Sequence, residues 1–425
     1  MVELGKNASV QTDLPWYREI NSKQWRALLA SGLGWMLDSM DVTLYAMVLV
    51  NVMADLHMDK SIGGLLASLT LLSSALGGII FGVVADKYGR TRSLMISMIV
   101  FSLFTAIQGF SQTVTQLAVL RLLLGLGMGG EWVAGAALIT ETWPAKHRGK
   151  AMGIVQGSWA IGYGLAAVVA GVLLPLFGWR GVFFFGIVPA LIAIWVRKGT
   201  DEPEIWSQRK ADQAAGETIE KGSVGKLFGK KVVRWTVLGS LLSVCAQFGY
   251  WGLFTWIPTY LGTPVAQGGA GLTVLKQTSW IVIMQVGAWL GYVIFGLLAD
   301  KIGRKITFIL FFALAAALVP FYGFSHDPTR LLLLGPLVAF FGSGYFSGFG
   351  AVLAELFPTA IRATGQGFTY NFGRAVAASA PFTVGALANT YGLGAAFSIT
   401  SIAFATAALL VLFFLPETKG RELEA

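Results

Sequence analysis

The chain has 425 residues, of which 55% are hydrophobic and only 12% are charged, and its mean hydropathy is +0.67. A water-soluble chain carries about 25% charged residues, so this composition argues against a soluble enzyme and indicates an integral membrane protein. The net charge of +9 needs no nucleic acid to explain it, because no soluble module with a basic face is present.

Apolar stretches long enough to cross a membrane, about 20 residues each, recur along the whole chain. They predict an all-α membrane protein with twelve transmembrane helices, at roughly 27–52, 61–85, 93–110, 114–140, 150–176, 181–197, 234–262, 277–299, 305–324, 330–356, 363–391 and 394–415. Six helices belong to an N-terminal half (1–197) and six to a C-terminal half (234–425). We interpret the polar segment 198–233 between them as a cytoplasmic linker.

The basic residues predict the orientation in the membrane. Of the 31 Lys and Arg, all but six fall in the two tails or in loops on one side. The six exceptions are Lys60, Arg180, Lys276, Arg330 and, within spans, Arg121 and Arg374. By the positive-inside rule we expect both termini in the cytoplasm of a multi-pass inner (plasma) membrane protein. The segment 1–25 is polar without a cleavable apolar stretch, so we expect the first span to stay as an anchor.

Charged residues within the first and fourth spans are candidates for proton coupling. A charge at mid-membrane costs about 2.5–3.5 kcal/mol, which suggests a function for each one kept there. Asp38 and Asp41 share one face of the first helix, roughly 18–22 Å deep by helical rise. Arg121 lies about 10 Å into the fourth helix, which also carries Glu131. We therefore expect a contact between an acid of the first helix and Arg121.

Three acids near one base leave an excess of carboxyl groups on the first and fourth helices. A desolvated carboxyl group beside a like charge takes up a proton more readily, so Asp38, Asp41 or Glu131 could carry protons, with Arg121 as their partner. The alternative is a static buried ion pair that holds the N-terminal half together.

Two loop motifs occur twice, and the residue numbers of both second copies are higher by 214. Gly82-Val-Val-Ala-Asp86-Lys-Tyr-Gly89-Arg90 recurs as Gly296-Leu-Leu-Ala-Asp300-Lys-Ile-Gly303-Arg304, and Glu141-Thr-Trp-Pro144…Arg148 recurs as Glu355-Leu-Phe-Pro358…Arg362. A common offset shows that the chain is a duplicated unit, which is typical of two-bundle transporters. The motif charges either set topology alone or act as a cytoplasmic gate.

Arg374 is the strongest candidate for a substrate ligand. It lies in Tyr370-Asn371-Phe-Gly-Arg374 of the eleventh span, about 17 Å from the cytoplasmic start of that helix. No acid of the C-terminal half is predicted at this depth, and a guanidinium binds a carboxylate through two hydrogen bonds. The alternative is a pairing across the cavity with Asp38, Asp41 or Glu131.

Other polar and aromatic residues inside the spans could line the same cavity, or could equally be ordinary helix packing. They are Trp132, Gln156, Trp159, Tyr163, Gln247, Tyr250, Trp251, Trp256, Gln285, Tyr345, Tyr370 and Asn371. Enzymatic chemistry is not indicated, because the three histidines fall in loops, no metal-ligand spacing occurs and Cys245 stands alone. We expect no metal and no cofactor.

These motifs resemble those of the major facilitator superfamily over essentially the whole chain. Arg121-Leu-Leu-Leu-Gly125-Leu-Gly127-Met-Gly129-Gly130-Glu131 and Pro416-Glu417-Thr418-Lys419-Gly420 match two more of its signatures. The resemblance implies that the loop charges hold the halves together on the cytoplasmic side in the outward-open state and do not touch substrate. These gate residues are Asp86, Arg90, Glu141, Arg148, Asp300, Arg304, Glu355 and Arg362.

A narrower resemblance is to the proton-coupled sialic acid permeases and their relatives that carry lactate, pyruvate and aromatic acids. It rests on Pro15-Trp-Tyr-Arg18…Gln24-Trp25-Arg26-Ala27, Leu37-Asp38-Ser-Met-Asp41 and Gly127-Met-Gly-Gly-Glu131. The chain departs from the sialic acid permeases in lacking two extra spans between the halves. It also lacks the Asn…His…Gln-Asp signature that the yeast monocarboxylate members have in the seventh helix.

The sequence therefore predicts a monomeric secondary transporter that takes up a small organic acid with protons and contacts only lipid otherwise. Arg374, Tyr370, Asn371, Gln156, Trp159, Gln247, Tyr250, Trp251 and Tyr345 are the predicted substrate-binding residues. A proton-independent facilitator or exchanger of sugar-like metabolites, a drug exporter and a non-transporting sensor remain alternatives.

Overall fold

The computed structural model describes residues 16–144, 147–204, 206–208, 211, 224–230, 232–358 and 361–419. The N-terminal half contains α1 (Ser22–Asp55), α2 (Lys60–Tyr88), α3 (Arg90–Ile107), α4 (Val114–Thr142), α5 (Arg148–Phe185) and α6 (Val188–Gly199). The C-terminal half contains α8 (Val233–Phe254), α9 (Ile257–Gly262), α10 (Val274–Ile302), α11 (Arg304–Gly323), α12 (Pro328–Gly344), α13 (Phe346–Leu356), α14 (Arg362–Ala377), α15 (Ser379–Tyr391), α16 (Leu393–Ala396) and α17 (Ser398–Phe414). Short 3-10 turns are η1 (Trp16–Arg18), η2 (Gln108–Phe110), η4 (Val224–Phe228) and η5 (Val265–Gln267). Much of the expected linker, 198–233, lies outside the described residues.

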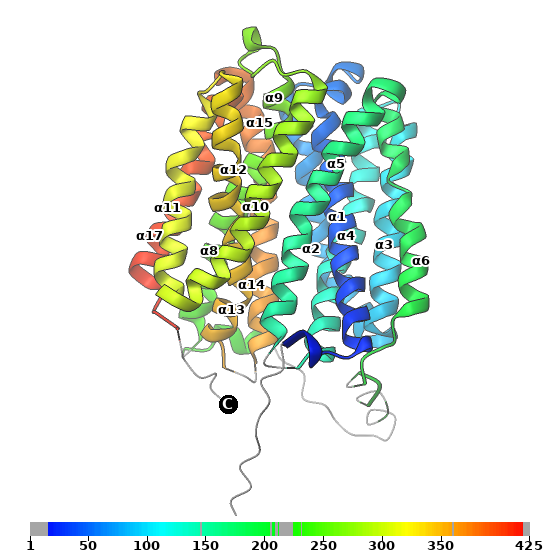
Figure 1. The fold of residues 1–425 in the computed structure, drawn as a ribbon, viewed down its shortest axis with the longest axis vertical. Helices are drawn as coiled ribbons and strands as arrows, with labels where there is room; N and C mark the ends of the chain where they lie inside the picture. The colour runs from blue at the N-terminus through cyan, green and yellow to red at the C-terminus, as the bar shows by residue number, and fades with distance from the viewer. Residues whose placement is uncertain are drawn as a thin grey trace, which may run out of the picture.

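Two helical bundles stand side by side, the first half of the chain in one and the second half in the other (Figure 1). This confirms the predicted all-helical, two-bundle fold. α1 begins and α17 ends at the same end of the molecule, the lower end in Figure 1. We call this the tail end and the opposite one the far end.

Ten helical segments of the described chain are long and apolar enough to cross a membrane. One of them, Arg148–Ile192, contains the expected fifth and sixth spans, joined at Gly178, whose φ of 66° interrupts the helix. The expected eleventh span is α14 and α15, where Gln366, Asn371 and Arg374 lower the hydropathy. The predicted boundaries were too short at α1, which begins five residues earlier and ends three residues later than expected.

Side-chain caps fix where several of these helices begin. Asn21 and Gln24 form a capping box at the start of α1, and each side chain accepts the other's backbone N–H at 2.9 Å. Asp59 caps α2 by accepting the backbone N–H of Ile62 at 2.8 Å. These caps position the first residues of helices that reach the centre of the molecule.

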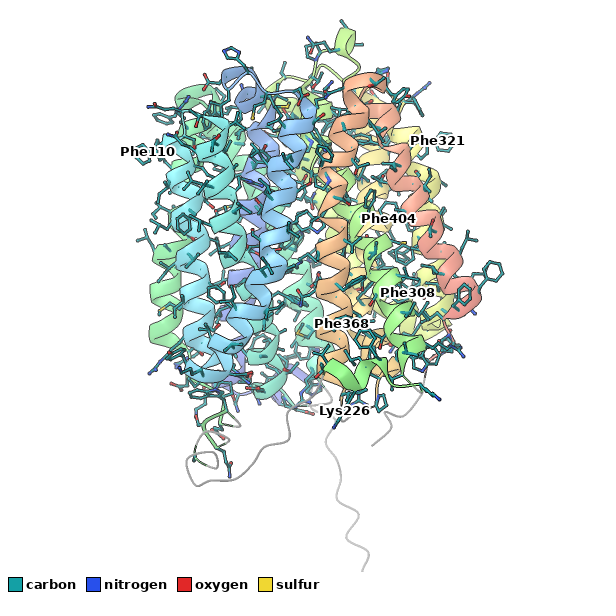
Figure 2. The ribbon with its side chains drawn as sticks, turned by 180° about the vertical axis from the view of Figure 1, so that it is seen from behind. Phe110, Lys226, Phe308, Phe321, Phe368 and Phe404 are labelled. Carbon is teal, nitrogen blue, oxygen red and sulfur yellow. The ribbon has the colours of Figure 1, made fainter. Side chains whose placement is uncertain are left out.

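The outer surface of both bundles is apolar. Phe110 is 71% exposed and Phe321 is 70% exposed, and both point away from the helices (Figure 2). Phe308 and Phe404 of the C-terminal half are fully buried instead. Exposed aromatic rings of this kind are unfavourable in water but suit lipid acyl chains, in agreement with a membrane location.

Candidate functional site

A cavity of about 280 Å³ lies between the two bundles. It is lined by Trp35, Gln156 and Trp159 of the N-terminal half and by Tyr250, Trp251, Tyr292, Phe346, Tyr370 and Arg374 of the C-terminal half. Six of these were predicted, namely Gln156, Trp159, Tyr250, Trp251, Tyr370 and Arg374. Both halves thus contribute side chains to one cavity, as expected of the central site of a two-bundle transporter.

Arg374 is the only charged residue among the nine that line the cavity, and it lies in the last turn of α14. Its side chain is 2% exposed, and its Nε has no hydrogen-bond partner in the described part of the chain. The guanidinium carbon lies 5.3 Å from the centre of the Tyr370 ring. Asp38 interacts with Arg374 electrostatically, although no described ion pair joins them. The guanidinium is thus free to bind a carboxylate.

Aromatic rings form most of the cavity wall. Trp159 Nε1 donates a hydrogen bond of 2.6 Å to the Tyr250 hydroxyl, which connects the two halves. Trp35 packs on Trp159 with ring centres 4.6 Å apart, and Trp251 meets Trp159 edge to face at 5.8 Å. Ring pairs at these spacings stabilise one another and fix the cavity wall.

Three carboxyl groups are buried in the N-terminal half. Asp38, Asp41 and Glu131 are each 1% exposed, and none forms an ion pair with a described residue. Both carboxyl oxygens of Glu131 lack a hydrogen-bond partner in the described chain, and the Thr105 side chain is the polar neighbour of Asp41. Glu131 presses against α1 at Gly34, where an added Cβ would lie 2.1 Å from Oε1. Burying an unpaired carboxylate is costly, so these groups are suited to carrying protons.

The contact expected between Arg121 and the acids of the first helix is not formed. The Arg121 guanidinium lies over the Tyr45 ring, 3.9 Å from its centre, nearer the far end of α1 than Asp38 or Asp41. Its Nε donates a long hydrogen bond of 3.4 Å to the Leu66 carbonyl. The N-terminal half is therefore not held together by an Asp–Arg pair at this position.

Three predicted substrate-binding residues do not line the cavity. Gln247 donates from Nε2 to the Tyr370 carbonyl at 2.9 Å and so helps to position Tyr370. The Tyr345 hydroxyl donates to a backbone carbonyl of α8, and Asn371 Nδ2 donates to a carbonyl of its own helix. Two further candidates are also buried: Trp256 donates from Nε1 to the Pro381 carbonyl of its own half, and Gln285 lies near Gly164 of the N-terminal half.

Three residues that line the cavity were not predicted: Trp35, Tyr292 and Phe346. The repeat contained a signal for Phe346, because it is the equivalent of Trp132, one of the candidates, at the common offset of the two copies. Tyr370 is the equivalent of Gln156 at the same offset. Trp132 stacks on Tyr370 across the two halves with ring centres 6.1 Å apart. The equivalent residues Gln156 and Tyr370 therefore line the same cavity, whereas of Trp132 and Phe346 only Phe346 lines it.

The charges of the repeated loops lie at the tail end and pair within their own half. Arg90 donates to Asp86 at 2.7 Å and, through two nitrogens, to Glu141 at 2.8 and 3.0 Å. The bidentate contact is the geometry that a guanidinium and a carboxylate prefer. The related set in the C-terminal half is Arg304, Asp300 and Glu355. Arg148 and Arg362 each donate to a backbone carbonyl just before their own helix.

A repeated glutamate caps each of the helices that follow these loops. Glu417 accepts the backbone N–H groups of Arg304 and Lys305 at the start of α11. Burial raises the pKa of Glu417, but hydrogen bonds from four backbone N–H groups outweigh it and leave the pKa below its ordinary value. Glu202 caps α3 in the same way, through Thr91 and Arg92. The sequence repeat did not reveal Glu202. The motif copies are 214 residues apart, whereas Glu202 and Glu417 are 417 − 202 = 215 residues apart.

The far end is closed by direct contacts between α2 and α15. Asn389 donates to Asp59 at 3.1 Å and to Ser61 at 2.7 Å, and it accepts the backbone N–H of Lys60. Gly64 allows α2 to approach α15 so closely that an added Cβ would lie 2.2 Å from a backbone oxygen. At the tail end, the ion pairs of the described gate charges stay within one half. The structure is thus closed at the far end by direct contacts between the two halves.

The first prediction concerns the gate. Asp86→Asn or Arg90→Ala should raise the population that is open at the tail end, because the resemblance assigns these charges to closing that end. Transport should slow, while the equilibrium affinity for substrate changes only modestly. Cysteine labelling from the tail side measures the open population. Lys87→Gln, next to Asp86 but outside its ion pair, is the control, and unchanged labelling in both gate variants would leave the motif a topological role alone.

Comparison with known proteins shows the family and the fold. The chain matches the model of the Major Facilitator Superfamily over residues 31–275 and 264–424. It is 33% identical over 404 residues to the cis,cis-muconate transport protein of Acinetobacter baylyi, covering 94% of this chain and 96% of that one. It is 28% identical to the sialic acid transporter NanX of Escherichia coli, covering 94% and 96%. The D-xylose-proton symporter structure superposes with a TM-score of 0.76 at 21% identity, covering 95% and 100%.

Proposed function

The chain belongs to the major facilitator superfamily and is a membrane transporter of metabolites; from this we propose that it carries an organic acid anion together with protons. The two halves rock against each other and expose the central cavity to one side at a time. The closed far end described above corresponds to one of the two states of this cycle.

A single observation carries the proposal: Arg374 is buried without an ion pair in the described chain, inside a cavity that both halves line. A buried guanidinium without a counterion is unfavourable, and a substrate carboxylate supplies that counterion through two hydrogen bonds. A site built to bind cationic or neutral amphiphiles would not present a buried cation to its ligand. The arginine therefore argues against a drug exporter.

The buried acids support proton coupling. Asp38 lies on the N-terminal side of the interface and interacts with Arg374 on the other half. When a substrate carboxylate binds at Arg374, a proton taken up by a buried acid compensates for the added negative charge. Substrate and proton then bind as a pair, which is what symport requires. Asp41 and Glu131 are further candidates for the proton path.

The aromatic walls favour a planar conjugated acid within this class. Trp35, Trp159 and Trp251 present flat surfaces near Arg374. An aromatic or unsaturated acid gains stacked or edge-to-face ring contacts on such surfaces, and these contacts stabilise aromatic pairs beyond the area they bury. One relative carries cis,cis-muconate, a conjugated acid, according to its name. We rank such acids above sialic acid and short monocarboxylates.

Charge distribution supports placing the tail end in the cytoplasm. The gate loops at this end carry the Lys and Arg residues that the positive-inside rule assigns to the inner face. An inward proton gradient would then drive uptake. We further propose that the monomer is the transporting unit, with the halves 1–197 and 234–425 as its moving bodies.

A thermal-shift screen of the purified protein tests the proposal, followed by flux into vesicles that contain a pH dye. The compounds are sialic acid, lactate, pyruvate, benzoate, nicotinate, cis,cis-muconate and neutral sugars. We expect a conjugated acid to stabilise the protein most and its influx to acidify the lumen. A neutral sugar as the best ligand would overturn the anion assignment. Acid flux without acidification would instead identify a proton-independent facilitator or exchanger.

A further inference from the structure

A second cavity, of about 400 Å³, lies between the halves on the far side of the first one. Its wall includes Arg121, about 10 Å along α4 from the far end, and Tyr45 of α1. The other half contributes Thr255, at the break between α8 and α9, and Trp251. Tyr250 and Trp251 border both cavities, so this pair of rings separates them.

Arg121 is held in this wall but is not neutralised there. Its side chain is 1% exposed, and Nη1 has no hydrogen-bond partner in the described chain. The Tyr45 ring covers one face of the guanidinium at 3.9 Å, and the Tyr45 hydroxyl is fixed by donating to the Gly63 carbonyl. The Leu66 carbonyl accepts from Nε at 3.4 Å. No described acid forms an ion pair with Arg121, so its free donors remain for a ligand in the cavity.

We propose that Arg121 forms a second carboxylate subsite, which binds the transported anion when the far end is open. This inference rests on the proposed anion transport. In the opposite state, the α2–α15 contacts seal the far end, and the anion is held by Arg374 instead. The two arginines lie on different halves and on either side of the Tyr250–Trp251 pair. The anion therefore exchanges one guanidinium for the other as the halves rock.

Two measurements on opposite states test this subsite, with radiolabelled benzoate, nicotinate and cis,cis-muconate as probes. The first is the half-saturating concentration for influx from the far side in proteoliposomes. The second is the dissociation constant of protein locked shut at the far end by a Ser61→Cys/Asn389→Cys disulfide in a Cys245→Ser background. The side chains of Ser61 and Asn389 already lie 2.7 Å apart across the halves.

Arg121→Gln should raise the half-saturating concentration for influx about tenfold or more, since a charge-assisted hydrogen bond is lost. The dissociation constant of the locked protein should change less than twofold. Arg374→Gln should raise both values. Arg180→Gln removes an arginine that pairs with Asp55 at the far end outside the cavity, and it should change neither.

Arg121→Lys keeps the charge and is the second variant to measure if Arg121→Gln does not fold. It should retain the wild-type melting temperature yet still raise the half-saturating concentration, because the planar fork is lost. Equal changes in both measurements, or none, would overturn the subsite, as would failure of both Arg121 variants to fold. If wild type binds and transports no acid, the proposed function itself fails, which is a distinct result.

Discussion

Replacing Arg374 with Lys is expected to remove most of the protein's preference for an acid over the corresponding amide. Lysine keeps the positive charge but not the planar fork that gives two parallel hydrogen bonds to a carboxylate. Arg374→Ala should abolish acid binding, with a loss greater than the about 1.5–3 kcal/mol of one charged hydrogen bond, because two are lost. Binding of benzoate and benzamide to wild type and to each variant measures the preference.

A matched control exists in the same half. Arg234 is exposed at the start of α8 and lies over the Trp235 ring at 4.4 Å, much as Arg374 lies over Tyr370. Arg234→Lys should leave the preference unchanged. If Arg374 has only a structural role, its substitution should lower the melting temperature and weaken the binding of the acid and of the amide to the same extent. If Arg374→Lys prefers the acid over the amide as strongly as wild type does, Arg374 is not the carboxylate ligand.

The fold could be predicted from the sequence because its signals are long and repeated. Apolar stretches of about 20 residues mark the spans, and the common offset between the two copies of each loop motif shows the duplication. The broken helices could not be predicted. Tyr345 stands at the break between α12 and α13 and faces the bundle, whereas its neighbour Phe346 lines the cavity. Such a local rotation depends on tertiary packing.

The position of Arg121 shows how depth estimates fail. The first span was predicted as 27–52, but α1 extends from Ser22 to Asp55. By helical rise, Arg121 lies about 10 Å from the far end of α4, whereas Asp41 lies about 20 Å from the far end of α1. Arg121 is therefore about 10 Å nearer the far end than Asp41 is. Tyr45 lies closer to the level of Arg121 and occupies the face of its guanidinium. Helical rise gives depth along one axis, but not the partner on the neighbouring helix.

The proton should be carried by at least one of the three buried acids, and Asp38→Asn is the variant expected to show it most clearly. Asparagine is nearly isosteric but cannot be protonated and deprotonated, so the anion binds Arg374 without taking up a proton. Accumulation of the acid against its gradient should then be lost, while exchange of labelled for unlabelled acid persists. Asp41→Asn and Glu131→Gln complete the series. Proteoliposomes with an imposed pH gradient measure accumulation, and the same vesicles at equal pH measure exchange.

The two measurements separate coupling from binding. A variant that loses both activities has lost the site or the fold, and a melting curve with bound acid tells which. A variant that keeps exchange but loses accumulation has lost only the link to the proton. We expect this split first at Asp38, because Asp38 is buried and Arg374, the group that the substrate neutralises, also contributes to its electrostatics from the other half. If all three variants still concentrate the acid in proton-driven vesicles, the acids have a structural role and the coupling site lies elsewhere.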